Sequence, residues 1–373
     1  MPFVPFDMEE WQSTWENRVR HNLSESGVHP LSIDELLALA GEDADRVLRL
    51  RMVYSQANGT EELRQRISAR YAGASPGNVL VTTGSAEANF VTCWRLLGPG
   101  TRAVVVAPTY MQTWGLATNF GGQVELLPCT PERLWDPDPE HLERVITPGT
   151  TLVVVTNPNN PTGHVLSAAA RQALLDRTRS VGAWLLADEV YQGAERNGVE
   201  TPTLWGSYDR VIVTGGLSKA YGLPGLRIGW SVGPADLIAS LWRRHDYTVI
   251  GPGPVTDFLA TLALRVRPKI LERTRSILNR NYPVLDAWLK SFGDFFEWQA
   301  PEAGAICWVR YRHRLGSLEL AERMRAEHSV LLEPGDHFRV PHHLRIGFGG
   351  DLLGDLDAAL AELTRGLQKL LAD

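Results

Sequence analysis

Six short apolar runs, each followed by a turn and most by a helical stretch, constrain the fold of this chain more than any other feature. Runs such as TLVVVTNP carry hydrophobic residues without polar alternation, which is typical of strands buried on both faces. Their alternation with helical stretches such as SAEANFVTCWRLLG predicts an α/β domain with a mostly parallel sheet covered by helices. The six runs lie at 78–84, 101–108, 122–128, 151–158, 183–190 and 210–216.

The pattern changes near residue 255. A long helical stretch at 255–292 precedes short strands around AGAICWVRYR and LRIGFGG, and further helices are expected at 316–328 and 354–372. This pattern predicts a second, smaller α+β domain. We therefore expect three parts: an N-terminal segment (1–45) that completes the small domain, a large domain (46–255) and the small C-terminal domain (256–373).

Composition excludes several classes of partner. The formal charge is −6, so no basic field favours nucleic acid. No apolar stretch has the roughly 18 residues that a membrane span needs, and the first residues contain no signal-peptide core. Cys93, Cys129 and Cys307 are spaced for neither a disulfide framework nor a zinc site, and we expect them to be buried thiols. A cytoplasmic protein without a membrane partner is therefore expected.

Polar residues at the strand ends are the candidate site, because ligands of such sheets bind beyond the carboxyl ends of the strands. Ser85 and Ala86 open a helix after the first run, and a helix N-terminus attracts phosphate. Asp188 ends the run WLLA, where a buried carboxylate needs a positive partner such as a protonated pyridine nitrogen. Lys219 lies in a glycine-rich turn with Arg227 eight residues on, and a nearby cation would lower the lysine's pKa and favour Schiff-base formation.

Three motifs occur in order: NPNNPTG (157–163), DEVY (188–191) and SKAYGLPGLRIG (218–229). Together they resemble the class I/II aminotransferase family of fold-type I enzymes that depend on pyridoxal 5'-phosphate (PLP). The match in order and spacing runs from about Tyr54 to Arg345. The resemblance implies a large domain with a mostly parallel seven-stranded sheet, a smaller α+β C-terminal domain, and PLP as the cofactor.

The resemblance also implies roles at the cofactor ring. Lys219 would carry the cofactor as a Schiff base and later move a proton. Asp188 would keep the pyridine nitrogen protonated, which makes the ring an electron sink. Asn160 and Tyr191 would hydrogen-bond the phenolic oxygen of the ring, and Tyr110 would stack on its face.

Further residues would hold the cofactor phosphate. By the resemblance these are Ser85, Ala86, Ser218 and Arg227. Tyr54 corresponds to a tyrosine that the family donates to the phosphate in the neighbouring subunit, which implies a homodimer. The family often has serine or threonine three residues before the lysine, and Gly216 stands there instead. One phosphate contact is therefore lost or replaced.

For the substrate, the resemblance implies that Arg345 grips the α-carboxylate by paired hydrogen bonds. Asn160 would assist, and Gly27 lies where the family's N-terminal segment closes over the substrate. Trp114 is a further pocket candidate.

Structural interpretations remain open for several of these residues. Asp188 is compatible with a helix N-cap, Asn160 with a turn, Tyr110 and Tyr191 with core aromatics, and Arg345 with a surface arginine. His337, His342 and His343 lack the spacing of a helical metal-ligand pair, so we predict no metal and expect them in a loop or on the surface.

The implied activity is chemistry at the α-carbon of an amino acid through an external aldimine and a carbanion, with transamination as the first interpretation. Cyclisation, elimination or replacement in natural-product biosynthesis is the alternative. The segments NLSESGVH (22–29) and HDYTVIGPG (245–253) resemble the capreomycidine-synthase-like branch, which cyclises hydroxylated arginine derivatives. The matching positions are Ser24, Ser26, Gly27, Val28, Asp246 and Tyr247.

A non-enzymatic class also exists within this fold, namely PLP-sensing regulators and catalytically silent relatives. A regulator would carry an added basic helix-turn-helix segment of about 60 residues, and a silent relative would be expected to lose the lysine or the aspartate. Lys219 and Asp188 are both present and no such segment is recognised, so the sequence favours an enzyme.

Overall fold

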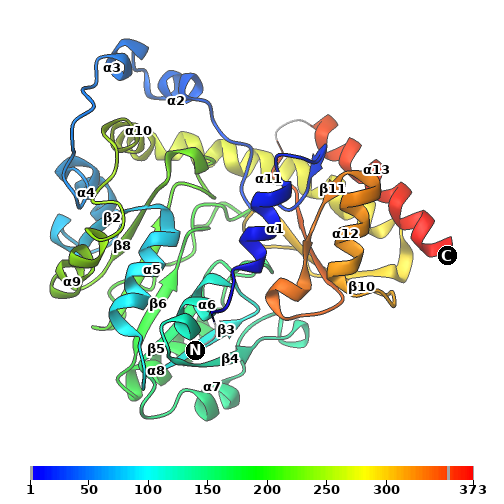
Figure 1. The fold of residues 1–373 in the computed structure, drawn as a ribbon, viewed down its shortest axis with the longest axis horizontal. Coiled ribbons are helices and arrows are strands. Elements are labelled where there is room, and N and C mark those ends of the chain that lie inside the picture. Colours follow the sequence, from blue (N-terminus) through cyan, green and yellow to red (C-terminus); the bar gives the residue numbers. More distant parts are fainter. Residues whose placement is uncertain (1–2, 351–352, 373) are drawn as a thin grey trace.

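The computed structural model describes residues 3–350 and 353–372. A seven-stranded sheet forms the centre of its larger part (Figure 1), with strand order β2-β8-β7-β6-β5-β3-β4. Each of the six predicted runs forms one of these strands. The seven strands of the sheet are β2 (Val79–Thr83), β3 (Arg102–Ala107), β4 (Gln123–Pro128), β5 (Leu152–Thr156), β6 (Trp184–Asp188), β7 (Val211–Gly216) and β8 (Ile228–Val232).

The sheet is mostly parallel, as predicted. The pairs β3–β4, β3–β5, β5–β6 and β6–β7 are parallel. The seventh strand, β8, lies between β2 and β7 and is antiparallel to both. The apolar-run pattern did not single it out, because its sequence IGWSV is interrupted by a glycine and a serine.

The run at 122–128 differs from the prediction of a strand buried on both faces. It forms β4, the edge strand, in which Leu127 is buried and Gln123 is exposed. Glu125 of this strand pairs instead with Arg102 of β3. An edge strand has only one neighbour, so polar side chains reach solvent along it.

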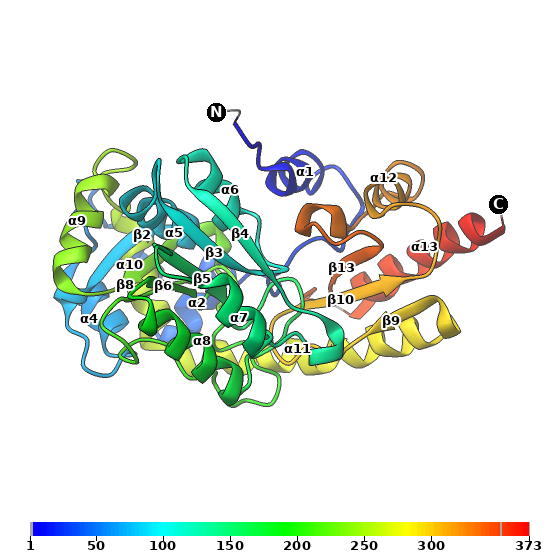
Figure 2. The ribbon, with the colours of Figure 1, turned by 90° about the horizontal axis from the view of Figure 1, so that it is seen from below.

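Helices cover both faces of the sheet (Figure 2). Successive strand residues point to opposite faces, and they form two separate cores: Val104 and Val153 belong to one, Val105 and Val154 to the other. The second core contains residues of α5 (Gly84–Leu96), α6 (Gln112–Asn119) and α9 (Ala235–His245). The first contains residues of α4 (Glu61–Ser68), α7 (Pro139–Val145), α8 (Ala168–Ser180) and α10 (Pro254–Arg265).

The predicted helical stretch at 255–292 is two helices rather than one. Helix α10 ends at Arg265, and α11 (Arg267–Lys290) begins after Val266 with Pro268 in its first turn. Proline fits the first turn of a helix but removes a hydrogen bond from a continuing one, which explains the break. Helix α11 then extends from the large sheet to the smaller part of the molecule (Figure 1).

The smaller part contains a four-stranded antiparallel sheet of order β12-β13-β10-β9. This is the expected α+β region, with both predicted strands and both predicted helices. Its elements are β9 (Phe296–Trp298), β10 (Ile306–Tyr311), β12 (Glu333–Pro334), β13 (His343–Gly347), α12 (Ser317–His328) and α13 (Leu353–Ala372).

The first part of the N-terminal segment lies against this smaller part. It contains α1 (Asp7–Trp15) and β1 (His21–Asn22), and β1 pairs in parallel with β11 (Val330–Leu331). The helices that follow, α2 (Ile33–Ala40) and α3 (Ala44–Leu48), lie over the larger part instead (Figure 1), where α2 packs against α10. Beyond β1 the chain follows β13, where Gly347 N donates to Leu23 O at 2.7 Å. It then reaches the turn after β7, where Leu31 N donates to Gly222 O at 2.9 Å. Residues 23–31 therefore bridge the two sheets.

The three cysteines are free and buried, as predicted. None of the helices in the described residues has the length and apolar character required to span a bilayer.

The close contact between β8 and α5 generates a test of this packing. A Cβ on Gly229 would lie 2.3 Å from the backbone of Gly84 and Ser85. Because backbone cannot move aside cheaply, Gly229→Ala should cost roughly 1–3 kcal/mol of stability and lower the melting temperature. Gly225→Ala is the matched control, since nothing lies within 4 Å of a Cβ there. Equal melting temperatures of the two variants would contradict this packing.

Candidate active site

Lys219 lies in the turn that follows β7, and its ammonium group has a carboxylate partner. Its Nζ is 3.2 Å from Oε1 of Glu25. Burial, the largest single effect, acts to lower the pKa of Lys219. The charge of Glu25, the charge of Tyr191 and the hydrogen bond to Glu25 together outweigh burial, and the pKa is raised. The prediction that Arg227 lowers this pKa is therefore wrong: the pKa is raised, and the cation that acts to lower it is Arg345.

Glu25 was not singled out by sequence reasoning, although it lies within the NLSESGVH segment. Its Oε1 accepts hydrogen bonds from the backbone amides of Ser26 and Gly27, both at 2.8 Å. Lys219 and these amides lower the pKa of Glu25 to about 2, although burial opposes them. Gly27 itself packs against the lysine, because a Cβ there would lie 3.8 Å from Cδ of Lys219.

Asp188 ends β6 and is only 4% exposed. Its Oδ2 accepts from Nδ2 of Asn89 at 3.0 Å, and its Oδ1 accepts from Val190 N at 3.1 Å. No helix starts at Asp188, so it is not an N-cap. Burial raises its pKa, and no basic side chain among the described residues pairs with it. The carboxylate is thus a buried acceptor without a cation.

Asn89 positions this carboxylate and was also missed. It lies on α5, where the hydroxyl of Thr214 donates to its Oδ1 at 2.9 Å. Thr214 belongs to β7, so a helix and a neighbouring strand orient Asn89 toward Asp188. A buried asparagine in a helix that packs on the sheet was the available signal.

Arg345, on β13, is 1% exposed, so it is not a surface arginine. Its Nη1 donates to Oδ1 of Asn160 at 2.9 Å and its Nη2 to the carbonyl of Ser24 at 2.6 Å. Glu333 Oε2 lies 4.0 Å from its Nη2. Its Nε is buried without a hydrogen-bond partner in the described part of the chain. Asn160 therefore contacts the site rather than only shaping a turn.

The two tyrosines differ in their partners. Tyr191 lies three residues beyond the end of β6 and acts to raise the pKa of Lys219. Its hydroxyl is buried with no hydrogen-bond partner in residues 3–350 and 353–372. The hydroxyl of Tyr110 donates to Oε1 of Glu9 at 2.5 Å, and its ring packs against Phe6. Burial and then Glu9 raise the pKa of Tyr110 well above its usual range.

An anion cradle forms at the N-terminus of α5, which contains Ser85 and Ala86 in its first turn. A Cβ on Gly84 would lie 2.5 Å from Nη2 of Arg227, so the guanidinium lies at this helix end. Nη1 of Arg227 also donates to Oγ of Ser218 at 3.4 Å. The structure thus brings together the four residues expected at the phosphate.

Gly216 lies at the same cradle. A Cβ at this position would be 3.6 Å from Ser85 N. The glycine therefore leaves the helix end without the hydroxyl that the family often provides, as the sequence indicated.

Other residues singled out from the sequence lie outside this group of site residues. Tyr54 is 90% exposed. Trp114 is buried in the core with Arg339 over its ring. The expectation of a loop or surface position is wrong for His337, which is buried and hydrogen-bonded to Glu333. It is also wrong for His343, which begins strand β13 and is half-buried.

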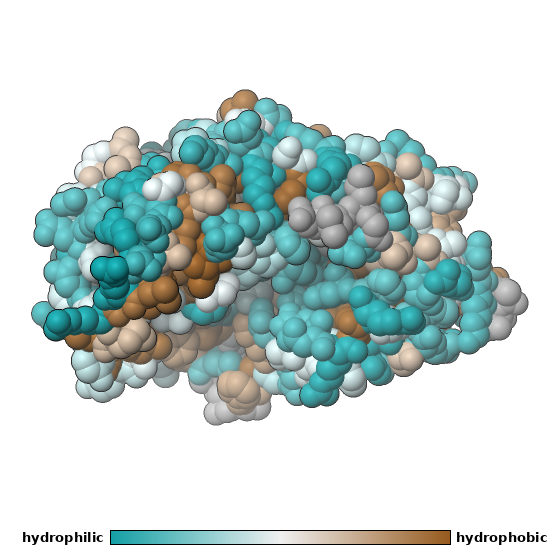
Figure 3. Space-filling view, turned by 90° about the horizontal axis from the view of Figure 1, so that it is seen from above, coloured by the Kyte–Doolittle hydropathy of each residue, from teal (hydrophilic) through white to brown (hydrophobic). Residues whose placement is uncertain are grey.

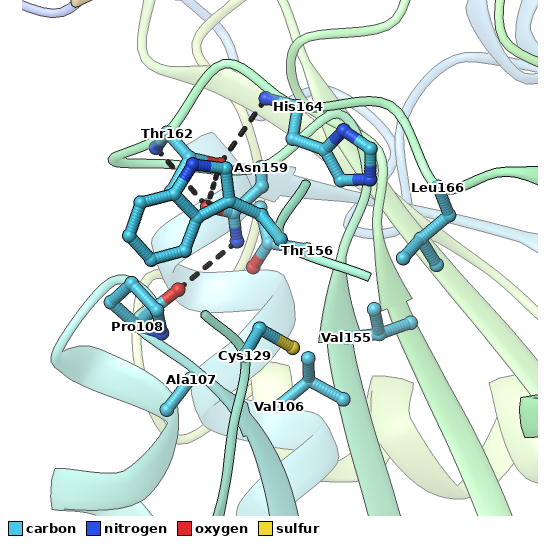
Figure 4. Close-up of a pocket in the computed structure, with 11 residues that line it drawn as sticks. Val106, Ala107, Pro108, Cys129, Val155, Thr156, Asn159, Thr162, His164 and Leu166 are labelled. Carbon is cyan, nitrogen blue, oxygen red and sulfur yellow. Dashed lines mark hydrogen bonds between the residues drawn. The ribbon is translucent and has the colours of Figure 1, made fainter. Parts of the chain in front are cut away.

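A separate, small cavity of about 10 Å³ lies beside the 157–163 loop (Figure 4). Neither Lys219, Asp188 nor Arg345 lines it. Asn159, which does line it, donates from Nδ2 to the carbonyl of Pro108 at 3.1 Å and accepts from the Thr162 hydroxyl at 2.8 Å. Asn159 therefore fixes the loop, and the neighbouring Asn160 reaches Arg345.

The arrangement fits PLP at three points. A buried carboxylate without a cation suits a protonated ring nitrogen. The unpartnered hydroxyl of Tyr191 suits a phenolic oxygen, because a buried donor without a partner is costly. A helix N-terminus beside a guanidinium suits a phosphate.

The family model described as "Aminotransferase class I and II" matches residues 38–361. The chain belongs to the class I and II aminotransferase family. It is a PLP-dependent, aminotransferase-like enzyme with the fold-type I architecture.

Relatives of this aminotransferase-family enzyme include more than one kind of activity. Capreomycidine synthase of Streptomyces vinaceus is 32% identical over 93% of this chain and 90% of that protein. A PLP-dependent aminotransferase from Streptococcus suis has a similar structure, with a TM-score of 0.93, 30% identity and 99% of both chains covered. The PLP-dependent cyclase OrfR gives a TM-score of 0.91 and 32% identity, covering 99% of this chain and 98% of that one.

Proposed function

We propose that this enzyme is an amino-acid aminotransferase. The observation that carries the proposal is the convergence of an amine, a buried carboxylate without a cation and a buried guanidinium. These are Lys219, Asp188 and Arg345, which come from two strand ends of the large sheet and from β13. An amine, an anion and a carboxylate receptor are what amino-acid chemistry on PLP requires.

When bound, PLP supplies an electron sink that stabilises negative charge on the substrate's α-carbon. Lys219 would bind the cofactor covalently through Nζ and move the α-proton. Asp188 would hold a proton on the ring nitrogen through its carboxylate. Tyr191 and Asn160 would hydrogen-bond the phenolic oxygen, and Tyr110 would pack on the ring.

The phosphate would be held at the anion cradle by the amides of Ser85 and Ala86, the hydroxyl of Ser218 and the guanidinium of Arg227. Tyr54 of a second subunit would add a further contact.

The substrate carboxylate would bind Arg345, whose unpartnered Nε is an available donor. Asn160 would assist this contact. Gly27 would let the N-terminal segment approach the substrate.

A second candidate is a PLP-dependent cyclase of secondary metabolism, with elimination or replacement as related outcomes. Two observations favour it. The similarity to capreomycidine synthase and to OrfR extends over nearly the whole chain. The 22–29 segment, which resembles that branch, also contacts Lys219 through Glu25 and Gly27.

Incubation with a panel of amino acids, followed by absorbance and product mass, tests both candidates. An aminotransferase gives the keto acid of its substrate and an aminated cofactor. A cyclase gives a dehydrated ring product and returns the cofactor unchanged. Borohydride should fix the cofactor on Lys219, and Lys219→Ala should lose both the visible band and turnover. A label on another lysine would contradict the proposal.

Replacement of Arg345 tests the substrate carboxylate site. Arg345→Lys keeps a positive charge but cannot make two parallel hydrogen bonds to a carboxylate. We expect kcat/KM to fall by roughly 10²-fold, with kcat falling as well because the bound substrate is misaligned. Steady-state kinetics on an accepted amino acid measures both. A near-normal kcat/KM would mean that the carboxylate is held elsewhere.

We also propose that the enzyme is a homodimer. Exposed apolar residues gather beside Tyr54 and on the 245–251 segment, and Figure 3 shows hydrophobic surface on this half of the molecule. The two segments touch, since Nε2 of His245 lies 3.0 Å from the carbonyl of Ala57. A contiguous apolar patch is typical of an interface. The most exposed members are Leu48, Met52, Val53, Tyr54, Tyr247, Val249 and Ile250.

A mixing experiment tests shared active sites. In a dimer of one Tyr54→Phe and one Lys219→Ala subunit, isologous symmetry places both lesions in one site and leaves the other intact. Activity of the mixture should therefore exceed that of either variant alone. No gain after subunit exchange, with heterodimers confirmed by native mass spectrometry, would contradict the sharing.

The division into an N-terminal segment (1–45), a large domain (46–255) and a small domain (256–373) is likewise proposed, as is a cytoplasmic location. The pairing of β1 with β11 supports the assignment of the N-terminal segment to the small domain. Three buried free thiols support the cytoplasmic location, because disulfides are rare in a reducing compartment.

A further inference from the structure

Glu25 is the one carboxylate in hydrogen-bond contact with Lys219 among the described residues, with 3.2 Å between Oε1 and Nζ. No motif of the aminotransferase resemblance contains it. It comes from the N-terminal segment, 194 residues away from the lysine in sequence. The contact therefore exists only because residues 23–31 bridge the two sheets.

The carboxylate is held in place independently of the lysine. Two backbone amides, those of Ser26 and Gly27, donate to the same oxygen that faces Nζ. The side chain is 48% exposed, yet its acceptor atom is fixed by local backbone. A Cβ on Gly27 would lie 3.3 Å from this oxygen, so a glycine there keeps the arrangement uncrowded.

Other charged groups also act on this pair. Glu16, directly after the end of α1, interacts with both members: burial first, and then the charges of Glu25 and Glu9, raise the pKa of Glu16, while Lys219 lowers it. From the other side, Tyr191 and Arg345 act on Lys219 in opposite directions. Of these groups, Glu25 is the one that is hydrogen-bonded to Nζ.

We propose that Glu25 is a positioning residue for Lys219: its carboxylate holds the ε-amino group at the reacting site and partners the positive charge that the lysine acquires on taking up a proton. This inference rests on the proposed function, in which Lys219 removes the α-proton. The proton moves from the α-carbon to Nζ, and the electron pair of the broken C–H bond stays with the substrate. Glu25 takes no proton itself. It stabilises the ammonium that results, since an opposite charge at hydrogen-bond distance favours the charged form.

The test measures the amine of Lys219 directly, in the full chain freed of cofactor. The chain has four lysines, Lys219, Lys269, Lys290 and Lys369, so acetylation by a limiting amount of acetic anhydride can be read at each by peptide mass spectrometry. Only the unprotonated amine reacts. In Glu25→Gln, labelling of Lys219 relative to Lys290 should rise at least several-fold at mildly alkaline pH, and its pH profile should move to lower pH.

Two variants sharpen the result. Glu25→Asp keeps the charge with a shorter reach and should label at an intermediate rate. Glu16→Gln removes a nearby charge that is not hydrogen-bonded to the lysine, and should change the ratio much less. Normalising to Lys290, which is paired with Asp286 on the far end of α11, removes effects of general loosening.

An unchanged ratio and pH profile in Glu25→Gln would overturn the inference, as would an equal effect of Glu16→Gln. Borohydride fixation in the unmodified enzyme separates this outcome from failure of the proposed function. Fixation on Lys219 together with unchanged labelling removes the role of Glu25 and leaves the function standing. Fixation elsewhere removes the function, whatever the labelling shows.

Discussion

The site depends on one buried anion. Asp188 ends a central strand, and its carboxylate is satisfied by Asn89 and Val190 N but by no cation in the described chain. Burial of such a group is costly, so the surrounding elements must supply hydrogen bonds and a ligand must supply charge. The order of β5, β6 and β7 brings the 157–163 loop, Asp188 and Lys219 to the same sheet edge. The cofactor that the family uses carries the missing positive group.

Much of this could be predicted from sequence, because local pattern determines it. Near-continuous Val and Leu runs predicted six strands, and the ordered motifs indicated which strand ends carry the chemistry. The pattern does not predict strand β8, because IGWSV lacks such a run. It predicts that β4 is buried on both faces, because the pattern of residues does not show whether a strand lies at the edge of a sheet. The ion pair of Glu25 with Lys219 and the hydrogen bond from Asn89 to Asp188 join residues far apart in the chain. An asparagine in a helix that packs on the sheet was a signal for Asn89, but local pattern identifies the partner of neither residue.

The prediction of a lowered pKa for Lys219 was wrong for the same reason: the group that acts on the lysine is distant in the sequence. Arg227 is near the lysine in sequence, but its backbone has a positive φ of 50° and its guanidinium lies at the N-terminus of α5. The charge that dominates comes instead from the N-terminal segment.

The most direct test of this account is exchange of the substrate's α-proton with solvent in Asp188→Asn. The asparagine keeps the shape but cannot hold a proton on the ring nitrogen. We expect the cofactor to remain on Lys219 while exchange slows roughly 100-fold, equivalent to about 2.7 kcal/mol in the barrier. Glu189→Gln is the matched control, since Glu189 is adjacent and buried but bonded to Leu204 N and the Thr203 hydroxyl, and it should retain exchange. An unchanged exchange rate in Asp188→Asn would mean that another group holds the ring proton, and would contradict the central role of this carboxylate.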